Sequence, residues 1–434
     1  MKLLDTKSKD FQKEFDTILK RADIDIKNVM PIVQNIIEEI KSQKDRALLK
    51  HIVKFDRWEP KSGSDLIIEK FLMKKAYEEL DEKLREALHL AYDRIKAYHE
   101  KQLPKSWLSF EENGTMLGQK VTPVDRAGLY IPGGKAAYPS SLLMNALPAI
   151  VAGVKEIVVT TPTPNNEPNP LLLAACYLCG IDKVYKVGGA SAIAALAFGT
   201  ETIPKVDVIT GPGNIFVATA KKMVYGEVNI DMIAGPSEIG IIADESANPK
   251  YIASDLLSQA EHDEMASSIL ITTSKKLANE VKKEVENFLK NLKRKKIAKE
   301  SIKNRGAIIV TNSLEEAIDL MNKIAPEHLE VLTKNPFEIL PFIRHAGAIF
   351  LGENTPEPIG DYIAGPNHTL PTGGTAKFYS PLNVEHFMKR SSIISFSQKA
   401  MMNIGEAAAL LANTEGLEAH AKSIEIRLND GCKK

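Results

Sequence analysis

Short β-branched segments alternate with helical segments from about residue 120 onward. The strand-like runs are IVVTT (157–161), KVYKV (183–187), VDVIT (206–210), EIGIIA (238–243), SILITT (268–273), AIIVT (307–311) and AIFL (348–351). Helical stretches lie between most of them, at 141–153, 169–179, 191–198, 214–225, 248–262 and 313–324. This alternation predicts parallel sheets covered by helices. The strands could form one large sheet or two smaller ones, and the segment 200–240, with two Gly-Pro turns, is a plausible place for a change of sheet.

The two ends of the chain have a different pattern. Residues 1 to about 105 are typical of helices with little strand signal, because apolar residues in 26–40 and 71–98 recur every three or four positions among Lys and Glu. Another helical stretch follows residue 390. With 434 residues, the chain is long enough for two or more domains.

The charge balance favours no charged class of partner. Lys and Arg total 56 and Asp and Glu total 56, so the net charge gives no reason to expect nucleic acid or an anionic membrane. The segment 275–305 is locally basic and could bind nucleic acid. However, the spacing of Leu277, Val281 and Val285 marks one buried face, which favours a solvated helix.

Cysteine usage and hydropathy indicate the compartment. Three cysteines cannot form a disulfide framework in a chain of this length, which favours a reducing compartment. Cys176 and Cys179 form a C-x-x-C in an apolar helix without a second pair, so buried structural thiols are favoured over a redox or zinc site. The charged N-terminus predicts no signal peptide, and no stretch approaches 18 apolar residues. We therefore expect a cytoplasmic protein without a membrane span.

Two glycine-rich loops, IPGGKAAYPSS (131–141) and TGPGNIF (210–216), open into predicted helices. Free backbone N–H groups at such helix starts suit an anion. Neither loop is a dinucleotide fingerprint or a P-loop, and such loops are more often tight turns than cofactor sites. They permit a phosphate-bearing ligand without proving one.

Two motifs place imidazoles beside oxygen ligands. Gln259 and His262 are three residues apart on a predicted helix, so they could share a metal on one face, or they could belong to a solvated helix end. Glu327 and His328 are adjacent at a predicted helix start or turn. Such a pair can act as general acid and base, although adjacent Glu and His are common on surfaces.

Two further segments carry polar residues in unusual settings. Residues 356–374 form a predicted loop rich in Pro and Gly that holds Asp361 and His368, and a loop of this length is more often functional than not. Glu415 and His420 would diverge by about 140° on one straight helix, so both can face one site only with a helix boundary near them.

Long motifs in the chain resemble those of histidinol dehydrogenases. They are DRAGLYIPGGKAAYPSSLLMNALPA (125–149), the segment 230–263 that ends in LLSQAEHD, APEHLE (325–330), the segment 360–392 that begins GDYIAGPNHTLPTGG, and EGLEAHAKS (415–423). The resemblance runs from about residue 20 to 425. It implies a homodimeric enzyme that oxidises L-histidinol through L-histidinal to L-histidine at the end of histidine biosynthesis. It also implies two NAD per turnover and one Zn²⁺ per subunit.

The resemblance implies a zinc site and a substrate site that share residues. The zinc ligands would be Gln259, His262, Asp361 and His420. Two imidazoles and two oxygens suit Zn²⁺ without excluding Mn²⁺ or Co²⁺, and the substrate's amine and imidazole would complete the coordination. The residues that would contact the substrate are Ser237, Gln259, His262, His328, Asp361, Glu415 and His420.

The family's catalytic roles map to Glu327 and His328. His328 would act as general base in both oxidations, since an imidazole of ordinary pKa suits proton removal at cytoplasmic pH. Glu327 would activate water to attack the aldehyde. Glu415 and His420 would serve the partner subunit's site, because the C-terminal segment of the family crosses the dimer.

The family's NAD contacts map to Tyr130 in GLYIPGG, Asn214 in GPGN and Ser191 in VGGASAIAALAFG. The family usually has glutamine at the position of Ser191. Serine is too short for the same reach, so Ser191 would contact NAD through water, or the cofactor would depend more on Tyr130 and Asn214.

The fold implied is α/β, with two incomplete Rossmann-like parallel-sheet domains, an N-terminal helical part and a small C-terminal helical arm, in a homodimer. The expected divisions are 1–110 (helical, packing with the catalytic domain), 120–235 (NAD-binding), 236–380 (zinc and substrate) and 381–434 (dimerisation arm). Two alternatives remain. One is a zinc hydrolase that uses Glu327 to activate water, and the other is a catalytically silent, metal-stabilised dimer or nucleic-acid binder.

Overall fold

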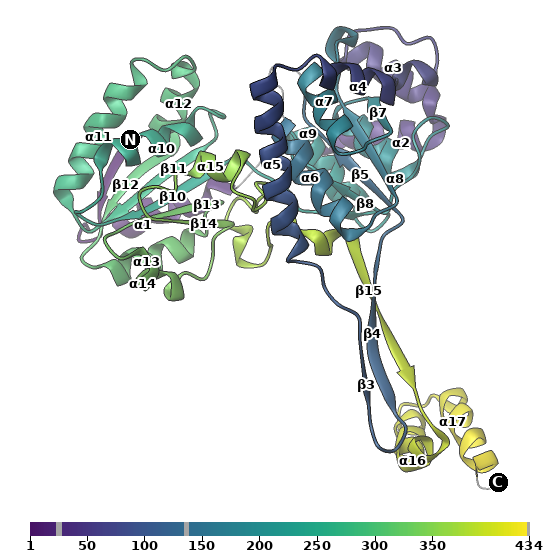
Figure 1. The fold of residues 1–434 in the computed structure, drawn as a ribbon. Coiled ribbons are helices and arrows are strands. Elements are labelled where there is room, and N and C mark those ends of the chain that lie inside the picture. The colour runs from purple at the N-terminus through teal and green to yellow at the C-terminus, as the bar shows by residue number, and fades with distance from the viewer. Residues whose placement is uncertain (23–27, 134–138, 432–434) are drawn as a thin grey trace. The chain divides into compact units, whose positions relative to one another are not determined.

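The computed structural model describes residues 1–22, 28–133 and 139–431. The chain forms two compact units (Figure 1). The first contains residues 1–102 and 124–387, and the second contains residues 103–123 and 388–434.

The first unit contains two six-stranded sheets, of which the first is formed mainly by residues 126–230. Its strand order is β2 (Ile67–Glu69), β7 (Lys183–Lys186), β6 (Glu156–Thr161), β5 (Arg126–Tyr130), β8 (Val208–Thr210) and β9 (Asn229–Ile230). Its strands are parallel except β2, which pairs antiparallel with β7. The helices of this part are α2 (Met30–Gln43), α3 (Asp45–Phe55), α4 (Lys70–Glu78), α5 (Glu82–Glu100), α6 (Pro139–Ala152), α7 (Pro170–Leu178), α8 (Gly189–Phe198) and α9 (Ile215–Val224).

The second sheet is entirely parallel. Its strand order is β1 (Lys2–Asp5), β12 (Gly306–Val310), β11 (Ser267–Thr272), β10 (Glu238–Ala243), β13 (His328–Leu332) and β14 (Ala348–Leu351). The accompanying helices are α1 (Phe11–Leu19), α10 (Pro249–Ala260), α11 (Lys275–Leu289), α12 (Lys295–Arg305), α13 (Leu314–Ile324), α14 (Pro336–Ile339) and α15 (Glu357–Tyr362).

Helices cover both faces of the second sheet (Figure 1). Alternate residues of β10 point to different cores: Ile239 and Ile241 pack with α10, α11 and α12, whereas Ile242 packs with α1 and α13. Every residue of β10, EIGIIA, is therefore buried. This explains why such strands read as continuous apolar runs in the sequence.

The two sheets share one topology. In each, the first three strands of the βα series lie side by side, and the fourth lies on the other side of the first, so β8 neighbours β5 and β13 neighbours β10. The strand order therefore reverses between β5 and β8 and between β10 and β13. In open α/β sheets, ligands bind outside the carboxyl ends of the strands at such a switch point.

The second unit combines an antiparallel sheet with two helices. Its strands, in the order β15 (Met388–Ser395), β4 (Met116–Pro123) and β3 (Trp107–Phe110), join segments far apart in the sequence. Helices α16 (Gln398–Thr414) and α17 (Glu418–Gly431) pack against each other.

The prediction of an α/β fold with parallel sheets is confirmed. The six helices expected between 141 and 324 lie within two residues of the expected ends. The basic segment 275–305 forms α11 and α12, and Leu277, Val281 and Val285 are buried as expected. Cys176 and Cys179 are buried and free within the described ranges. No helix in the described part of the chain has the length and apolar character needed to cross a membrane.

Three expectations about local structure were wrong. The N-terminal region, expected to be helical, also supplies β1 and β2 to the two sheets. Residues 356–374 are not a continuous loop, because α15 occupies Glu357–Tyr362. His328 begins strand β13 instead of a helix or turn, since it pairs in register with Ile239 of β10. The homodimer and the domain divisions stay predictions.

Candidate active site

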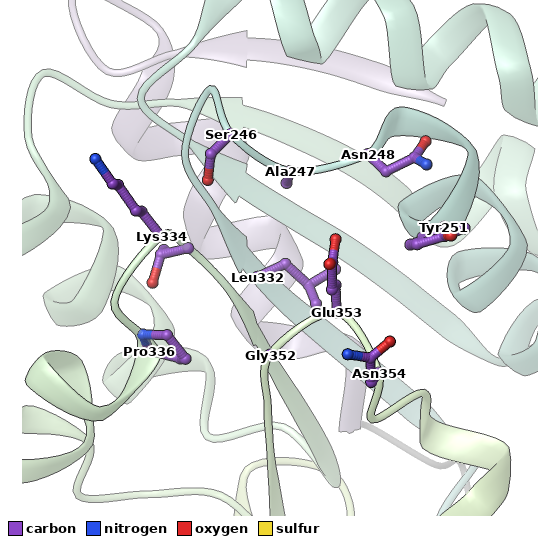
Figure 2. A pocket seen from close by; sticks show the side chains of 11 residues that line it. Ser246, Ala247, Asn248, Tyr251, Leu332, Lys334, Pro336, Gly352, Glu353 and Asn354 are labelled. Carbon is purple, nitrogen blue, oxygen red and sulfur yellow. The ribbon is translucent and has the colours of Figure 1, made fainter.

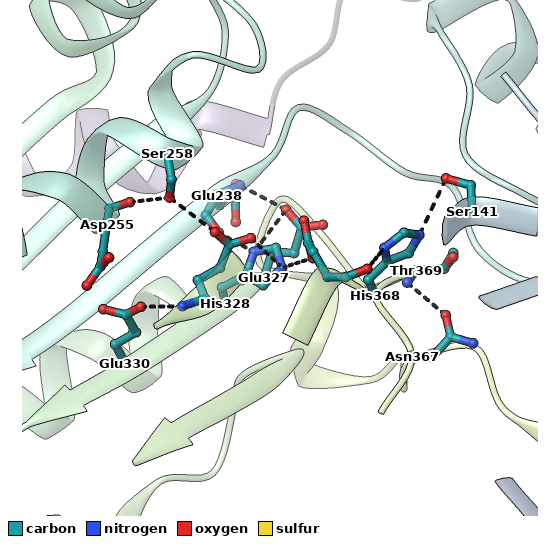
Figure 3. A network of polar contacts seen from close by, with 12 residues as sticks. Ser141, Glu238, Asp255, Ser258, Glu327, His328, Glu330, Asn367, His368 and Thr369 are labelled. Atoms are coloured by element: carbon teal, nitrogen blue, oxygen red, sulfur yellow. Dashed lines mark hydrogen bonds and ion pairs between the residues drawn. The ribbon is translucent and has the colours of Figure 1, made fainter. Parts of the chain in front are cut away.

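His328 lies buried at the amino end of β13, and its hydrogen bond fixes the roles of its two nitrogens. Nδ1 lies 3.1 Å from the carbonyl oxygen of Glu238 at the start of β10 (Figure 3). A carbonyl only accepts, so Nδ1 carries a hydrogen and donates it. In the neutral ring, Nε2 therefore has the free lone pair. Among the described residues, Nε2 has no hydrogen-bond partner.

Two carboxylates face Nε2 from helix α15. Glu357 Oε1 and Asp361 Oδ1 each lie 3.6 Å from this nitrogen, beyond direct hydrogen-bond contact. Glu357 is held in place because its N–H donates to Glu330 Oε1 (2.8 Å) and Ser258 Oγ donates to its Oε2 (3.1 Å) (Figure 3). Strand β13 and helix α10 thus orient the carboxylate that faces His328.

Glu327 lies on the other side of the imidazole. Its Oε2 accepts the backbone N–H of Glu238 at 2.9 Å and lies 3.7 Å from His328 Nδ1. The side chain of Glu238 is itself held in a buried ion pair with Arg21, at 2.8 Å. The N-terminal segment therefore supports the strand that orients both Glu327 and His328.

The buried charges of this cluster shift one another's pKa values. Burial alone would lower the pKa of His328, but the carboxylates of Glu327, Asp361 and Glu357 outweigh it and raise the pKa to about 10. Burial raises the pKa of Glu327 to about 8 and that of Glu357 to about 7. Burial would also raise the pKa of Asp361, but His328 and His368 hold it below its usual value. The cluster therefore favours a protonated imidazole beside at least one carboxylate.

His328, Glu357 and Asp361 form a group that could hold a metal ion, since their ligand atoms lie within 4.8 Å of one another. Gln259 lies on α10 beside Ser258, and its Oε1 is buried without a partner among the described residues. His262 follows the end of α10 and is open to solvent, and desolvation by the surrounding protein still lowers its pKa. Unpartnered imidazole and oxygen donors fit Zn²⁺.

Glu357 is the residue that the sequence interpretation missed. It precedes Asp361 by four residues in PEPIGDY, which places both side chains on one face of α15. This spacing would have identified the pair if the segment had been recognised as a helix. Asp361 and His328, both predicted from the sequence, do lie together, with Oδ1 of Asp361 3.6 Å from Nε2 of His328.

His368 connects this cluster to helix α6. Its Nδ1 donates to the backbone carbonyl of Asp361 at 2.9 Å, and its Nε2 lies 3.4 Å from Ser141 Oγ (Figure 3). Ser237 lies immediately before β10, where its carbonyl accepts the N–H of Ser267 at 3.0 Å.

The predicted NAD contacts gather at the carboxyl edge of the first sheet. Tyr130 ends β5, and Asn214 caps α9 by accepting the N–H groups of Phe216 (3.0 Å) and Val217 (3.2 Å). Gly211 has a φ of +120°, and a Cβ there would lie 1.9 Å from the carbonyl oxygen of Tyr130, so only glycine fits this turn. Residues 134–138 of the first glycine-rich loop lie outside the described residues.

Unpartnered hydroxyls surround this edge. Thr161 ends β6, Thr163 follows it and Thr210 ends β8; within the described ranges their buried hydroxyls have no partner. Buried polar groups are normally paired, so these atoms fit a ligand that carries hydrogen-bonding groups. The switch point between β5 and β8 therefore suits a nucleotide. The side chain of Ser191 is buried, and its Oγ lies 2.9 Å from Nδ1 of His51. Its contact with NAD stays a prediction.

Glu415 and His420 lie in the second unit, and both are exposed. Helix α16 ends at Thr414 and α17 begins at Glu418, so the helix boundary that the sequence required between them is present.

A cavity of about 340 Å³ lies elsewhere in the first unit, at the carboxyl edge of the second sheet (Figure 2). It is lined by turns after β10, β13 and β14, including Asn248, Lys334 and Glu353. Leu332 borders it at the end of β13, about 13 Å along the strand from His328 at its start. The residues that line it do not include those of the His328 cluster.

The family model described as histidinol dehydrogenase matches residues 19–428 of the chain. The chain belongs to the histidinol dehydrogenase family. It is 70% identical over 423 residues to the histidinol dehydrogenase of Sulfurimonas denitrificans, covering 98% of both chains. It is 68% identical over 428 residues to that of Wolinella succinogenes, covering 99% of both.

A solved member of the histidinol dehydrogenase family has the same fold. The crystal structure of histidinol dehydrogenase from Elizabethkingia anophelis superposes with a TM-score of 0.92 at 36% identity, covering 99% of this chain and 98% of that one. The resemblance inferred from the motifs and the prediction of an oxidoreductase are confirmed. The alternatives of a zinc hydrolase and a catalytically silent dimer find no support in this family.

Proposed function

We propose that the chain oxidises L-histidinol through L-histidinal to L-histidine with two NAD, in the last steps of histidine biosynthesis in the cytoplasm. The observation that carries the proposal is the arrangement of His328. Its Nδ1 is committed to the carbonyl of Glu238, while its buried Nε2 remains open toward Glu357 and Asp361. A base with one fixed nitrogen and one free nitrogen suits proton removal from a substrate hydroxyl.

Zinc is proposed to be held by Gln259, His262 and Asp361 of one subunit and by His420 of the other. The unpartnered Oε1 of Gln259 and the position of Asp361 beside His328 support this ligand set. When bound, the divalent cation would orient the substrate's amine and imidazole and would offset the carboxylate charges that hold the His328 imidazole protonated. Glu357 adds a carboxylate to the same region, through which it can orient His328.

NAD is proposed to bind at the switch point of the first sheet, beside Tyr130 and Asn214. The unpartnered hydroxyls at this edge and the glycine turn at Gly211 support this location. When bound, NAD would supply the hydride acceptor for each oxidation, which corresponds to two NAD for each histidinol.

The residues divide the work as follows. His328 takes the proton of the substrate's hydroxyl through Nε2 as the carbon loses hydride, which leaves the aldehyde. Glu327 then removes a proton from water as the water oxygen attacks the aldehyde carbon, and His328 returns its proton to the aldehyde oxygen, giving a gem-diol and a neutral imidazole. His328 deprotonates that diol during the second hydride loss, and the product is the carboxylate.

The proposed assembly is a homodimer in which the second unit completes the partner's site. That unit exposes many large apolar side chains: Phe110 is 73% exposed, Ile394 69% and Leu410 67%. An exposed apolar surface of this kind suits contact with a second copy of the chain. Glu415 and His420 would contact the substrate and metal of the partner.

Substitutions at Glu327 and His328 test the division of work. His328→Asn should lower kcat with histidinol and with histidinal by roughly 10²–10⁴, because both oxidations lose their base. Glu327→Gln should lower the rate with histidinal more than the first turnover with histidinol, since only the aldehyde step needs water. Rates are followed by NADH absorbance, and far-UV circular dichroism checks folding. Equal losses with histidinol and histidinal in Glu327→Gln would contradict the role of Glu327, and no NADH from wild type would contradict the function.

A further inference from the structure

Glu39, His51 and Ser191 form a hydrogen-bonded row where helices α2, α3 and α8 meet. His51 Nδ1 lies 2.9 Å from Ser191 Oγ, and its Nε2 lies 2.8 Å from Glu39 Oε2. A carboxylate only accepts, so Nε2 carries a hydrogen, and in the neutral ring Nδ1 accepts the hydrogen of Ser191. His51 is 6% exposed and Ser191 3%, so water hardly competes for this contact.

The row ends at the first turn of α8, at the carboxyl edge of the first sheet. Gly188 begins this turn, and a Cβ there would lie 2.4 Å from Pro162 Cβ, so the turn is pressed against the segment that follows β6. The N–H of Gly189 donates to the hydroxyl of Tyr130 at 3.3 Å. Ser191 is the third residue of the helix, so its contact with His51 also constrains Gly189 and Tyr130.

We propose that His51 is a positioning residue of the NAD site. It holds Ser191 and thereby fixes the first turn of α8 against Tyr130 in the arrangement that binds the cofactor. The inference rests on the proposed function, which places NAD beside Tyr130 and Asn214. Ser191 is buried and its hydroxyl is engaged, so it acts through α8 instead of reaching the cofactor. Glu39 orients the ring of His51 from the opposite side.

A double-mutant cycle tests this role. His51→Leu and Ser191→Ala should each raise the KM for NAD by roughly three- to tenfold, the effect of losing one hydrogen bond, with kcat and the KM for histidinol unchanged. The double variant should match the single variants, because both remove the same contact. His51→Asn, whose amide can replace Nδ1, should recover most of the NAD affinity. NADH fluorescence measures binding in the same variants without turnover.

His89→Leu is the matched control. His89 on α5 is half-buried and, like His51, hydrogen-bonded, with Nε2 2.6 Å from the Tyr77 hydroxyl. This hydrogen bond joins α5 to α4 and does not involve α8, so its loss should leave the KM for NAD unchanged. A KM for NAD within twofold of wild type in His51→Leu would overturn the inference. It would also be overturned if the increases in KM of the two single variants multiplied in the double variant. Wild type that binds NADH but does not oxidise histidinol would instead overturn the proposed function alone.

Discussion

At the residue scale, chemistry depends on which atoms are left without partners. The sequence identified His328 as a candidate base and Asp361 as a candidate metal ligand. It could not indicate that the carbonyl of Glu238 fixes the imidazole of His328. That contact arises from strand pairing between β10 and β13, segments some 90 residues apart. The raised pKa of His328 depends on Glu327, its neighbour in the sequence, and also on Asp361 and Glu357, which only folding brings near.

Asp56 provides a test of burial at this scale. Its carboxyl is 6% exposed, and burial raises its pKa to about 6. The folded state therefore binds more protons than the unfolded state between the usual aspartate pKa and about pH 6. Its contribution to stability is complete below this window and is lost as pH rises through about 6. The free energy of unfolding of Asp56→Asn, relative to wild type, should consequently be about 2 kcal/mol higher at pH 7 than at pH 4.

Urea unfolding of wild type and Asp56→Asn at the two pH values measures this difference. Asp10→Asn, at an exposed position, is the control and should show no such change with pH. A stability difference between Asp56→Asn and wild type that is the same at pH 4 and pH 7 would contradict the burial argument.

At the element scale, local patterns predicted the helices and buried strands well but failed where partners are distant. β10 and β11 are fully buried apolar runs, which a short window of sequence reveals. β3 is exposed along its whole length, and β15 pairs with β4, more than 260 residues away in the sequence, so neither strand has a local signal. Helix α15 was missed because its six residues include Pro358 and Gly360.

The buried pair of Lys221 and Asp231 tests how helix α9 is joined to the glycine turn. Lys221 Nζ contacts Asp231 Oδ1 and donates to the carbonyl of Gly211 at 2.9 Å, while Asp231 Oδ2 accepts the N–H of Gly211 at 2.8 Å. Lys221→Met should destabilise the protein by about 3–5 kcal/mol, because it leaves the Asp231 charge buried and unpaired.

The double variant Lys221→Met/Asp231→Asn separates charge from packing. It removes the unpaired charge but keeps an amide oxygen as acceptor, so it should be more stable than Lys221→Met alone in urea denaturation. If the double variant were less stable than Lys221→Met, the unpaired charge of Asp231 would not be the cause of the loss in the single variant.

At the scale of the whole molecule, the proposed site belongs to two chains. The first unit supplies His328, Glu327, Gln259, His262 and Asp361, whereas Glu415 and His420 are exposed on the second. Apolar side chains exposed on the second unit, such as Phe110 and Leu410, support contact with another copy. The motifs implied this division through the family resemblance, and no spacing in one chain could have established it.

Subunit mixing tests the shared site. His328→Asn and His420→Ala should each be inactive alone, since one removes the base and the other a proposed metal ligand. In a heterodimer, one of the two sites would combine an intact His328 with an intact His420, so activity should return. Heterodimers verified by two different affinity tags that remain inactive would contradict the sharing.

One site is proposed to carry out both oxidations of histidinol. The most direct measurement is the ratio of NADH formed to L-histidine formed when limiting L-histidinol is consumed by the zinc-loaded enzyme with excess NAD. We expect two NADH for each histidine and no accumulated histidinal. One NADH for each histidinol, with histidinal left as the product, would contradict this proposal.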